Sequence, residues 1–257
     1  MARKIVVTSG KGGVGKTTVC VFLGLCLAKL NKKVIILDLD FSLNNLDVVA
    51  GVEDKVCFDI ADVVEGRCRV KQAIVPVRQN LAVIQSGKSD FKRVTGQNVR
   101  LLMEGLSGYD YILLDCPAGM DTGFDRAISS ADEAMIVLNP TLTSMRDADK
   151  VVNALRLYRI ESVFAVVNKV RGDLQVKGKT MSVAEIENVV KLPVIGAIPD
   201  DDGILLAESV DSVSGDAMKA FKLLAKRLVK GSGRVFDCSK RYSGILGSLM
   251  RKLKRRC

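Results

Sequence analysis

The chain of 257 residues contains no histidine. Imidazole is the side chain most often used for proton transfer near neutral pH and the commonest protein ligand of metal ions. Its absence excludes histidine acid–base catalysis and histidine metal sites. Among common metal sites, Mg²⁺ bound by oxygen ligands remains.

Paired cysteines and long apolar runs are missing as well. The seven cysteines, at positions 20, 26, 57, 68, 116, 238 and 257, form no C-x-x-C pair. An odd count without such pairs indicates reduced thiols rather than a disulfide framework. No run of about 20 apolar residues exists, and the run from Ile5 to Val7 is too short for a signal peptide. We therefore expect a protein of the cytosol.

The hydrophobic content of 48% is enough for one large folded domain. Runs typical of strands, at roughly 3–9, 33–40, 81–85, 109–115, 133–138, 161–168 and 193–198, alternate with segments of helix length. This alternation predicts an α/β fold of the P-loop NTPase kind, with a mostly parallel twisted sheet and helices on both faces. Motifs at the carboxyl ends of the strands should then meet at one edge.

A glycine-rich stretch joins the first predicted strand to a helix. Residues 9–18 read S-G-K-G-G-V-G-K-T-T and satisfy the triphosphate-binding pattern G-x-x-x-x-G-K-[ST]. Glycines let successive N–H groups turn inward as an anion nest, and a following helix directs its positive end at the same phosphates. Lys16 reaches the β and γ oxygens, and the Thr17 hydroxyl is placed to bind Mg²⁺. The predicted nucleotide-binding residues are Gly10, Lys11, Gly12, Gly13, Val14, Gly15, Lys16, Thr17 and Thr18.

Carboxylates end two of the predicted strands. Asp38 and Asp40 close the second strand, with Asn45 shortly after, and Asp115 ends a later apolar strand. Pro117, Ala118 and Gly119 follow Asp115 directly. These acids are candidate groups for Mg²⁺ and water beside the triphosphate, and capping of the following helices is the alternative.

Two further strand ends carry polar residues that suit a nucleotide base. One ends in Asn168-Lys169 and the other in Pro199-Asp200. An asparagine amide offers one acceptor and two donors, which suits the polar edge of a base. That the base is adenine is implied only by the family resemblance given below. An ordinary turn role for Asn168 is the alternative.

The carboxyl end combines basic charge with an apolar stripe. Six of the ten net positive charges lie in the last seventeen residues, and Gly231-Ser-Gly233 is a plausible hinge before them. We predict an ATPase domain over 1–232 and a linker and basic amphipathic membrane-targeting helix over 233–257, which we call the tail. Its apolar residues recur at helical spacing, as in a helix lying in the interface of an anionic membrane. Docking on the protein's own core and a nucleic-acid arm are the less favoured alternatives. The predicted membrane-binding residues are Ile245, Leu246, Leu249, Met250, Leu253, Arg251, Lys252, Lys254 and Arg255.

These motifs, with the early lysine Lys11, resemble the deviant Walker-A ATPases of the MinD/ParA family and are most similar to the MinD group. The likeness covers nearly the whole chain. It implies that Lys11, Lys16, Asp40 and Asn45 are catalytic, with Lys11 reaching the nucleotide of a second subunit and Asp40 orienting the attacking water. It also implies that Thr17, Asp38 and Asp115 lie at Mg²⁺. Pro117, Ala118 and Gly119 would form the switch that senses the γ-phosphate.

The resemblance further implies a biological role. Such an Mg²⁺-dependent ATPase dimerises on ATP, binds the inner face of the cell membrane through the tail and recruits a division inhibitor that places the septum. Its location would be cytoplasmic and peripheral on the cytoplasmic face of the membrane. Arg146, Asp147 and Asp149 become candidate contacts for an inhibitor of the MinC type, with an activator of the MinE type or a polar anchor as a further partner. A solvated helix face is the alternative for these three.

Other functions within and beyond the family stay open. A flagellar-number regulator would be favoured by a long segment ahead of the loop, and nine residues precede Gly10. A DNA-partition ATPase of the ParA type would carry basic residues across its folded domain, and a scaffold gated by nucleotide would lack turnover. The iron–sulfur cluster of nitrogenase relatives is disfavoured by the cysteine spacing, with a cluster shared across a dimer left open. The tail departs from the family in being more basic and in ending at Cys257.

Overall fold

One mixed sheet organises the computed structural model, which describes residues 2–87, 93–205, 212–244 and 247. Its strands are β1 (Arg3–Thr8), β2 (Val34–Asp38), β3 (Val75–Arg78), β4 (Leu81–Ile84), β5 (Tyr111–Asp115), β6 (Glu133–Leu138), β7 (Ser162–Val170) and β8 (Val194–Pro199). They lie in the order β3-β4-β2-β5-β1-β6-β7-β8, and every neighbouring pair is parallel except β3 with β4. The seven predicted strands are confirmed.

Strand β3 was not predicted. It is four residues long, alternates between buried and exposed, and contains Pro76. Proline cannot donate to a ladder and is tolerated at a sheet edge, which is where β3 lies. So short a run with a proline gives too weak a period-two signal to be recognised.

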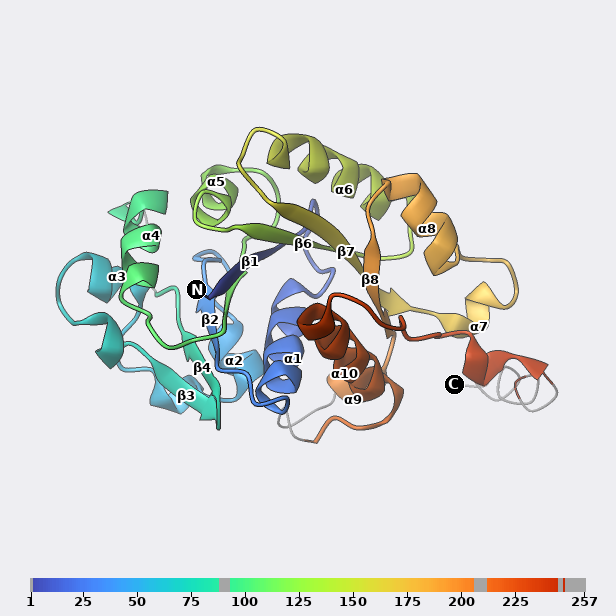
Figure 1. Cartoon of the computed structure of the whole chain (residues 1–257), viewed down its shortest axis with the longest axis horizontal. Coiled ribbons are helices and arrows are strands. Elements are labelled where there is room, and N and C mark those ends of the chain that lie inside the picture. Colours follow the sequence, from blue (N-terminus) through green and yellow to red (C-terminus); the bar gives the residue numbers. More distant parts are fainter. Residues whose placement is uncertain (1, 88–92, 206–211, 245–246, 248–257) are drawn as a thin grey trace.

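Helices cover both faces of the sheet (Figure 1). They are α1 (Lys16–Ala28), α2 (Leu46–Ala50), α3 (Ile60–Val64), α4 (Gly96–Glu104), α5 (Thr122–Ile128), α6 (Leu142–Leu155), α7 (Gly172–Gln175), α8 (Val183–Val190), α9 (Asp202–Leu205) and α10 (Gly215–Lys230), with short 3₁₀ turns η1 (Glu53–Lys55), η2 (Val70–Gln72) and η4 (Lys240–Tyr242). The core of one face packs under α1, α2 and α10, and the core of the other under α3, α4, α5, α6 and α8. None of the described helices is long and apolar enough to cross a bilayer.

The strands read as continuous apolar runs because both faces are buried. Along β1, Ile5 and Val7 belong to the core under α1 while Val6 between them belongs to the other core. Stacked rings of Phe22 and Phe221, with centroids 5.3 Å apart, join α1 to α10. Each fully buried ring contributes about 1.5–3 kcal/mol to stability.

Arg3 ties the start of the sheet to the end of α10. Its Nε and one terminal nitrogen each donate to Glu133 at 2.6 Å, and the other terminal nitrogen donates to the Leu228 carbonyl at 2.6 Å. The guanidinium also lies over the Tyr111 ring, 5.5 Å from its centroid. A bidentate pair of this kind holds its geometry better than a single contact does.

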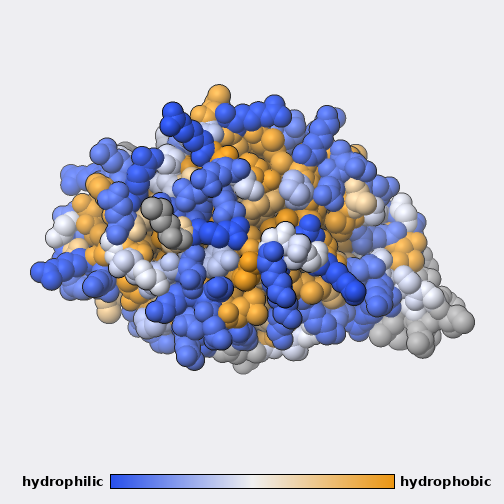
Figure 2. Space-filling view, viewed as in Figure 1, coloured by the Kyte–Doolittle hydropathy of each residue, from blue (hydrophilic) through white to orange (hydrophobic). Residues whose placement is uncertain are grey.

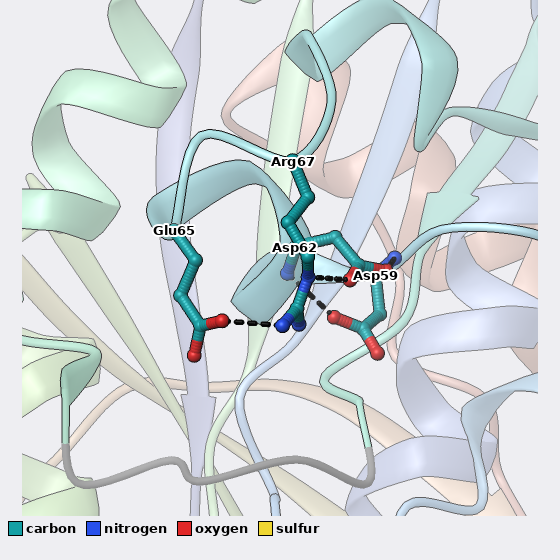
Figure 3. Close-up of polar contacts among 4 residues, drawn as sticks. All are labelled: Asp59, Asp62, Glu65 and Arg67. Carbon is teal, nitrogen blue, oxygen red and sulfur yellow. Dashed lines mark hydrogen bonds and ion pairs between the residues drawn. The ribbon is translucent and has the colours of Figure 1, made fainter.

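The start of α3 is fixed by a reciprocal cap (Figure 3). Asp59 accepts from the Asp62 N–H at 2.9 Å, and the Asp62 side chain accepts from the Asp59 N–H at 3.0 Å. Arg67 donates to Asp62 at 2.6 Å and pairs with Glu65 at 2.5 Å. The Ile60 N–H donates to the Gln85 carbonyl at 2.9 Å, so this capped turn holds the carboxyl end of β4 in place.

The chain beyond α10 returns over the folded domain. Gly231 and Gly233 have positive φ, as a sharp change of direction needs. Val235 and Phe236 are then half-buried, and Cys238 is buried. Residues 234–242 therefore lie on the surface of the domain, and the division of the chain after residue 232 stays a prediction. The predicted membrane-binding residues lie outside the described residues; these are Ile245, Leu246, Leu249, Met250, Leu253, Arg251, Lys252, Lys254 and Arg255.

Candidate functional site

The glycine-rich loop joins β1 to α1 at the carboxyl edge of the sheet. Gly15 is the N-cap of α1 with φ of 95°, and Gly13 has φ of 76°. A Cβ on Gly10 would lie 2.3 Å from the Asp147 carbonyl oxygen, so the loop also passes close against α6. Glycine is needed at these positions, and the free N–H groups of the first turn of α1 are left facing a site suited to an anion.

The end of β7 supports the loop from behind. The Asn168 amide donates to the Val14 carbonyl at 2.8 Å, and the Lys169 ammonium donates to the Gly13 carbonyl at 2.8 Å. A Cβ on Gly15 would lie 2.4 Å from the same Asn168 amide nitrogen. Asn168 therefore holds the loop, a contact that its predicted role at the base did not include.

Three aspartates, Asp38, Asp40 and Asp115, lie at or just after the ends of β2 and β5. Asp38 accepts from the Asp40 N–H at 2.9 Å, the Gln85 amide at 3.1 Å and the Ser86 hydroxyl at 3.2 Å. Burial raises the pKa of Asp38 well above its usual range, and the nearby charge of Asp115 raises it further. The two carboxyl groups lie at the ends of neighbouring strands, and the negative charge on Asp115 makes ionisation of Asp38 less favourable.

Asp115 is buried as deeply as Asp38, and its Oδ1 has no hydrogen-bond partner among the described residues. Burial raises its pKa to about 6, while the Thr17 hydroxyl and the charge of Lys16 act in the opposite direction. A buried carboxylate oxygen without a partner is costly, and a cation is the ligand that would remove the cost.

Asp40 and Asn45 follow β2 in the loop that leads to α2. The Asp40 carboxylate accepts from the N–H groups of Ser42 and Leu43, each at 3.2 Å, so its orientation is fixed by the backbone. Asn45 is the N-cap residue of α2 and is exposed. Both residues line the cavity described next.

A cavity of about 420 Å³ gathers most of the predicted nucleotide site. It brings together residues from four segments that are far apart in the sequence, within 13–18, 40–49, 168–169 and 199–204. Its predicted lining residues are Gly13, Gly15, Lys16, Thr17, Thr18, Asp40, Asn45, Asn168, Pro199 and Asp200. Gly10, Lys11, Gly12, Val14, Asp38 and Asp115 do not line it. Lys16 is buried whereas Lys11 is exposed, so the two lysines of the loop have different surroundings.

A larger hollow of about 890 Å³ lies on the other side of residues 199–202 and contains no residue of the glycine-rich loop. Its walls come from α10, the turn η4 and residues 234–238. Phosphate chemistry belongs to the smaller cavity, because residues of the loop, Lys16 and Asp40 all line that one.

The switch segment after β5 lies next to the loop. The Gly119 N–H is 3.4 Å from the Ser9 carbonyl oxygen, and a Cβ on Gly12 would lie 3.8 Å from the Ala118 Cβ. Pro117 is buried while Ala118 and Gly119 are half-buried. Their predicted role as a switch stays a prediction.

The predicted partner residues lie on α6. Arg146 and Asp149 are exposed, and Asp149 accepts from Asn153 at 3.4 Å. Asp147 is half-buried, pairs with Lys150 at 3.2 Å and contacts the loop through its backbone. Their partner-binding role stays a prediction.

Sequence reasoning missed several polar residues that support the site. Gln85 and Ser86 hydrogen-bond Asp38, and both also donate to Asn44, Ser86 at 2.7 Å. They follow β4, which is the neighbour of β2, so the polar residues at the end of the predicted strand 81–85 and directly after it were the available signal. Lys169 was noted only as the neighbour of Asn168, and its φ of 55° could not be read from the sequence.

The residues of this site fit a nucleoside triphosphate with Mg²⁺. The glycine cradle, the buried lysine and the hydroxyl of Thr17 suit phosphate, and the unpartnered Asp115 oxygen suits a hard cation. In the described part of the chain, no three acids, cysteines or histidines are grouped to hold a metal alone. Mg²⁺ would therefore depend on phosphate oxygens and water as well, which is its usual mode of binding.

Known proteins resemble this chain along most of its length. The model of a family described as an AAA domain matches residues 2–163. The septum site-determining protein MinD of Synechocystis sp. is 35% identical over 266 residues, which cover 98% of this chain and 99% of that protein.

Solved structures give the same result. The MinC:MinD cell division protein complex of Aquifex aeolicus contains a chain with 35% identity and a TM-score of 0.81, covering 91% of this chain and 98% of that one. The septum site-determining protein MinD complexed with Mg-ADP from Pyrococcus horikoshii has 28% identity and a TM-score of 0.79, covering 90% and 97%. With the loop, the acids and the sheet order in place, this chain belongs to the MinD family of septum site-determining ATPases.

Proposed function

We propose that this chain is a Mg²⁺-dependent ATPase that dimerises on ATP, binds the cytoplasmic face of the cell membrane through its tail and recruits a division inhibitor. The observation that carries the proposal is the cavity in which the glycine-rich loop, Lys16, Asp40 and Asn45 meet. Nucleotide chemistry at that place, combined with a basic amphipathic tail, is the combination that a membrane switch requires.

The reaction is attack of water on the γ-phosphate. Asp40, held by two backbone N–H groups, and Asn45 orient the water, and Lys16 balances the charge that develops on the phosphate. Positioning and electrostatics dominate phosphoryl transfer, so Asp40 orients the water more than it removes a proton. When bound, Mg²⁺ supplies positive charge to the phosphate oxygens, with Thr17, Asp38 and Asp115 as the residues that would hold it.

Dimerisation is supported by Lys11 and by apolar side chains at the same edge. Lys11 is exposed and outside the lining of the cavity, which suits contact with a nucleotide in a second subunit. Leu43, Met120 and Leu142 are 63%, 47% and 71% exposed in segments that follow β2, β5 and β6. Large apolar residues exposed beside the site favour burial against another protein.

Membrane attachment rests on the tail. One helix with five large apolar residues and several basic ones binds weakly, since ordering it costs roughly 1–2 kcal/mol per residue. Two tails on one ATP-held dimer bind about 10²–10⁴ times more tightly through avidity. Nucleotide state would then control residence on the cytoplasmic face of the membrane.

A division inhibitor of the MinC type is the proposed partner, with an activator of the MinE type or a polar anchor as a second. A solved relative is a MinC:MinD complex, and this chain is 35% identical to its MinD-like chain. On α6, Arg146 and Asp149 are exposed and able to meet a partner. Charge reversal at both positions is expected to weaken inhibitor binding without changing nucleotide affinity.

The first experiment is co-sedimentation with anionic vesicles under ATP and under ADP, with duplex DNA in a parallel assay. In one variant the chain ends after Gly244. This removes the predicted amphipathic part of the tail and keeps residues 234–242, which pack on the domain. We expect vesicle binding only with ATP and the tail. Asp40→Ala should keep ATP-dependent dimerisation and vesicle binding but lose turnover. Binding to DNA without binding to vesicles would assign the chain to the partition class instead.

A further inference from the structure

The root of the tail is packed against α7. The turn η4 contacts α7 directly. A Cβ on Gly172 would lie 1.8 Å from the Cys238 carbonyl oxygen and 3.1 Å from the Tyr242 ring. The two segments approach so closely that only glycine fits, and the point at which the tail leaves the domain is therefore fixed beside α7.

The turn that follows α7 is a closed structure. The N–H groups of Lys177 and Lys179 donate to the Leu174 carbonyl at 3.2 and 2.9 Å, and the Gly178 N–H donates to Gln175 at 2.9 Å. The Gln175 side chain donates to the Met181 carbonyl at 3.0 Å. Val176, the C-cap residue of α7 directly before this turn, is 39% exposed, and Figure 2 shows apolar surface over α7.

Basic side chains lie on this turn and on the neighbouring turn η4. Lys179, Lys240 and Arg241 are exposed, and Lys177 is half-buried. Within the residues that the structure describes, neither Lys177, Lys179 nor Lys240 is within ion-pair distance of a carboxylate. We name Val176, Lys177 and Lys179 the α7 surface, while Lys240 and Arg241 belong to the first part of the tail.

Several of the nearby acids are engaged. Asp173 is buried and pairs with Arg171 at 2.9 Å, and Asp237 accepts from the Ser239 N–H and hydroxyl. Asp216 pairs with Lys219 at 2.9 Å and with Arg241 at 3.7 Å, and Glu185 caps α8. Three further acids, Asp200, Asp201 and Asp202, line the hollow of about 890 Å³ together with Lys240 and Arg241, so the positive charge next to Val176 comes from Lys177 and Lys179.

We infer that the α7 surface is a second membrane contact, which meets an anionic phospholipid leaflet together with the tail. Two observations select lipid as the occupant. The surface is complementary in charge to an anionic leaflet, and it is continuous with the tail, which leaves the domain beside it. The inference rests on the proposed function, because the tail supplies the main anchor.

This contact would set the orientation of the domain on the membrane. A flexible tail alone allows the domain to tumble above the lipid, whereas two contacts side by side hold one edge of the sheet toward it. Each basic residue near an anionic leaflet strengthens binding about fivefold. Reversing Lys177 and Lys179 should therefore weaken binding by about 25-fold or more.

The test uses the full chain with a non-hydrolysable ATP analogue and vesicles of phosphatidylcholine and phosphatidylglycerol in equal parts. Lys177→Glu/Lys179→Glu is compared with Lys29→Glu/Lys33→Glu, which makes the same charge change at exposed lysines in the connection between α1 and β2. We expect the first variant to lose about 25-fold in vesicle affinity and the second less than about threefold. Val176→Ser should reduce binding by a smaller factor. Dimerisation and nucleotide affinity should not change in any variant.

The outcomes separate this inference from the proposed function. If the parent chain binds vesicles and Lys177→Glu/Lys179→Glu binds equally well, or the control pair weakens binding as much, the α7 surface is not a lipid contact. If removal of residues 245–257 leaves vesicle binding intact, the proposed anchor is wrong, and the result supports the α7 surface as a lipid contact. A parent chain that does not bind vesicles overturns both. Loss of partner binding with unchanged vesicle affinity would assign the surface to an acidic protein instead.

Discussion

Asp115→Asn should change how the stability of the nucleotide-free protein depends on pH. The buried Asp115 carboxyl has a pKa of about 6 in the folded state against an ordinary value of 3.8. Between these two values the folded protein binds more protons than the unfolded chain does. The contribution of Asp115 to the free energy of unfolding therefore falls as the pH rises from 3.8 to about 6, and this contribution is constant at higher pH.

The size of this fall follows from the two pKa values. The difference corresponds to about 3 kcal/mol lost by the parent at neutral pH. Asparagine has no proton to lose, so Asp115→Asn should not show this loss. Asp38 adds to the effect in the same direction, because the charge of Asp115 helps to raise its pKa. The amide itself has unmet hydrogen bonds at all pH values, so the quantity to compare is the change with pH rather than the absolute stability.

The assay is urea unfolding without nucleotide or Mg²⁺ at several pH values between 4.5 and 8, for the parent, Asp115→Asn and Asp54→Asn. Asp54 is exposed and serves as the matched control. Unfolding curves of the parent and Asp115→Asn that shift in parallel with pH would refute the assignment of a raised pKa to Asp115. Added Mg·ADP should stabilise the parent at pH 8 more than it stabilises Asp115→Asn.

Three further substitutions test close contacts in different parts of the domain. Gly15→Ala places a Cβ 2.4 Å from the Asn168 amide at a φ of 95°, and should weaken binding of a fluorescent ADP analogue by about tenfold or more; an affinity within about twofold of the parent would contradict this. Arg3→Leu removes the hydrogen bonds to Glu133 and Leu228 and should cost about 1–3 kcal/mol in urea unfolding, so a cost below about 0.5 kcal/mol would count against the role of this contact. Gly172→Ala should displace the Cys238 backbone, and hydrogen exchange over residues 234–242 should become faster; unchanged exchange there would mean that α7 does not hold the root of the tail.

The sheet was predictable because its strands are buried on both faces and read as uninterrupted apolar runs. The seven strands of the prediction are the long or fully buried ones, such as β2 and β5, where all five residues are buried. The glycine-rich loop was predictable for a different reason, since its φ angles and close contacts leave few other residues possible. The structure confirms both features.

Contacts between distant loops could not be predicted. Nothing in the local sequence indicates that the Asn168 amide reaches Val14 or that Gln85 and Ser86 reach Asp38, because these contacts depend on strand order and register. The return of residues 234–238 over the domain could not be predicted either, because it also depends on contacts with distant segments. Two glycines beside a basic tail indicate a hinge, while the burial of Cys238 depends on a groove made by other elements.

Asn168 and Lys169 fix the shape of the phosphate loop from within the chain, because they donate to the carbonyls of Val14 and Gly13. A loop held in this way loses little backbone freedom when a ligand binds, and we expect it to bind ADP and ATP alike. We expect the switch segment to discriminate between the two, because its Gly119 N–H is only weakly bonded to Ser9 at 3.4 Å. A terminal phosphate that captures this N–H exchanges a long bond for a charge-assisted one. The Gly119 N–H would then be the group that distinguishes ATP from ADP.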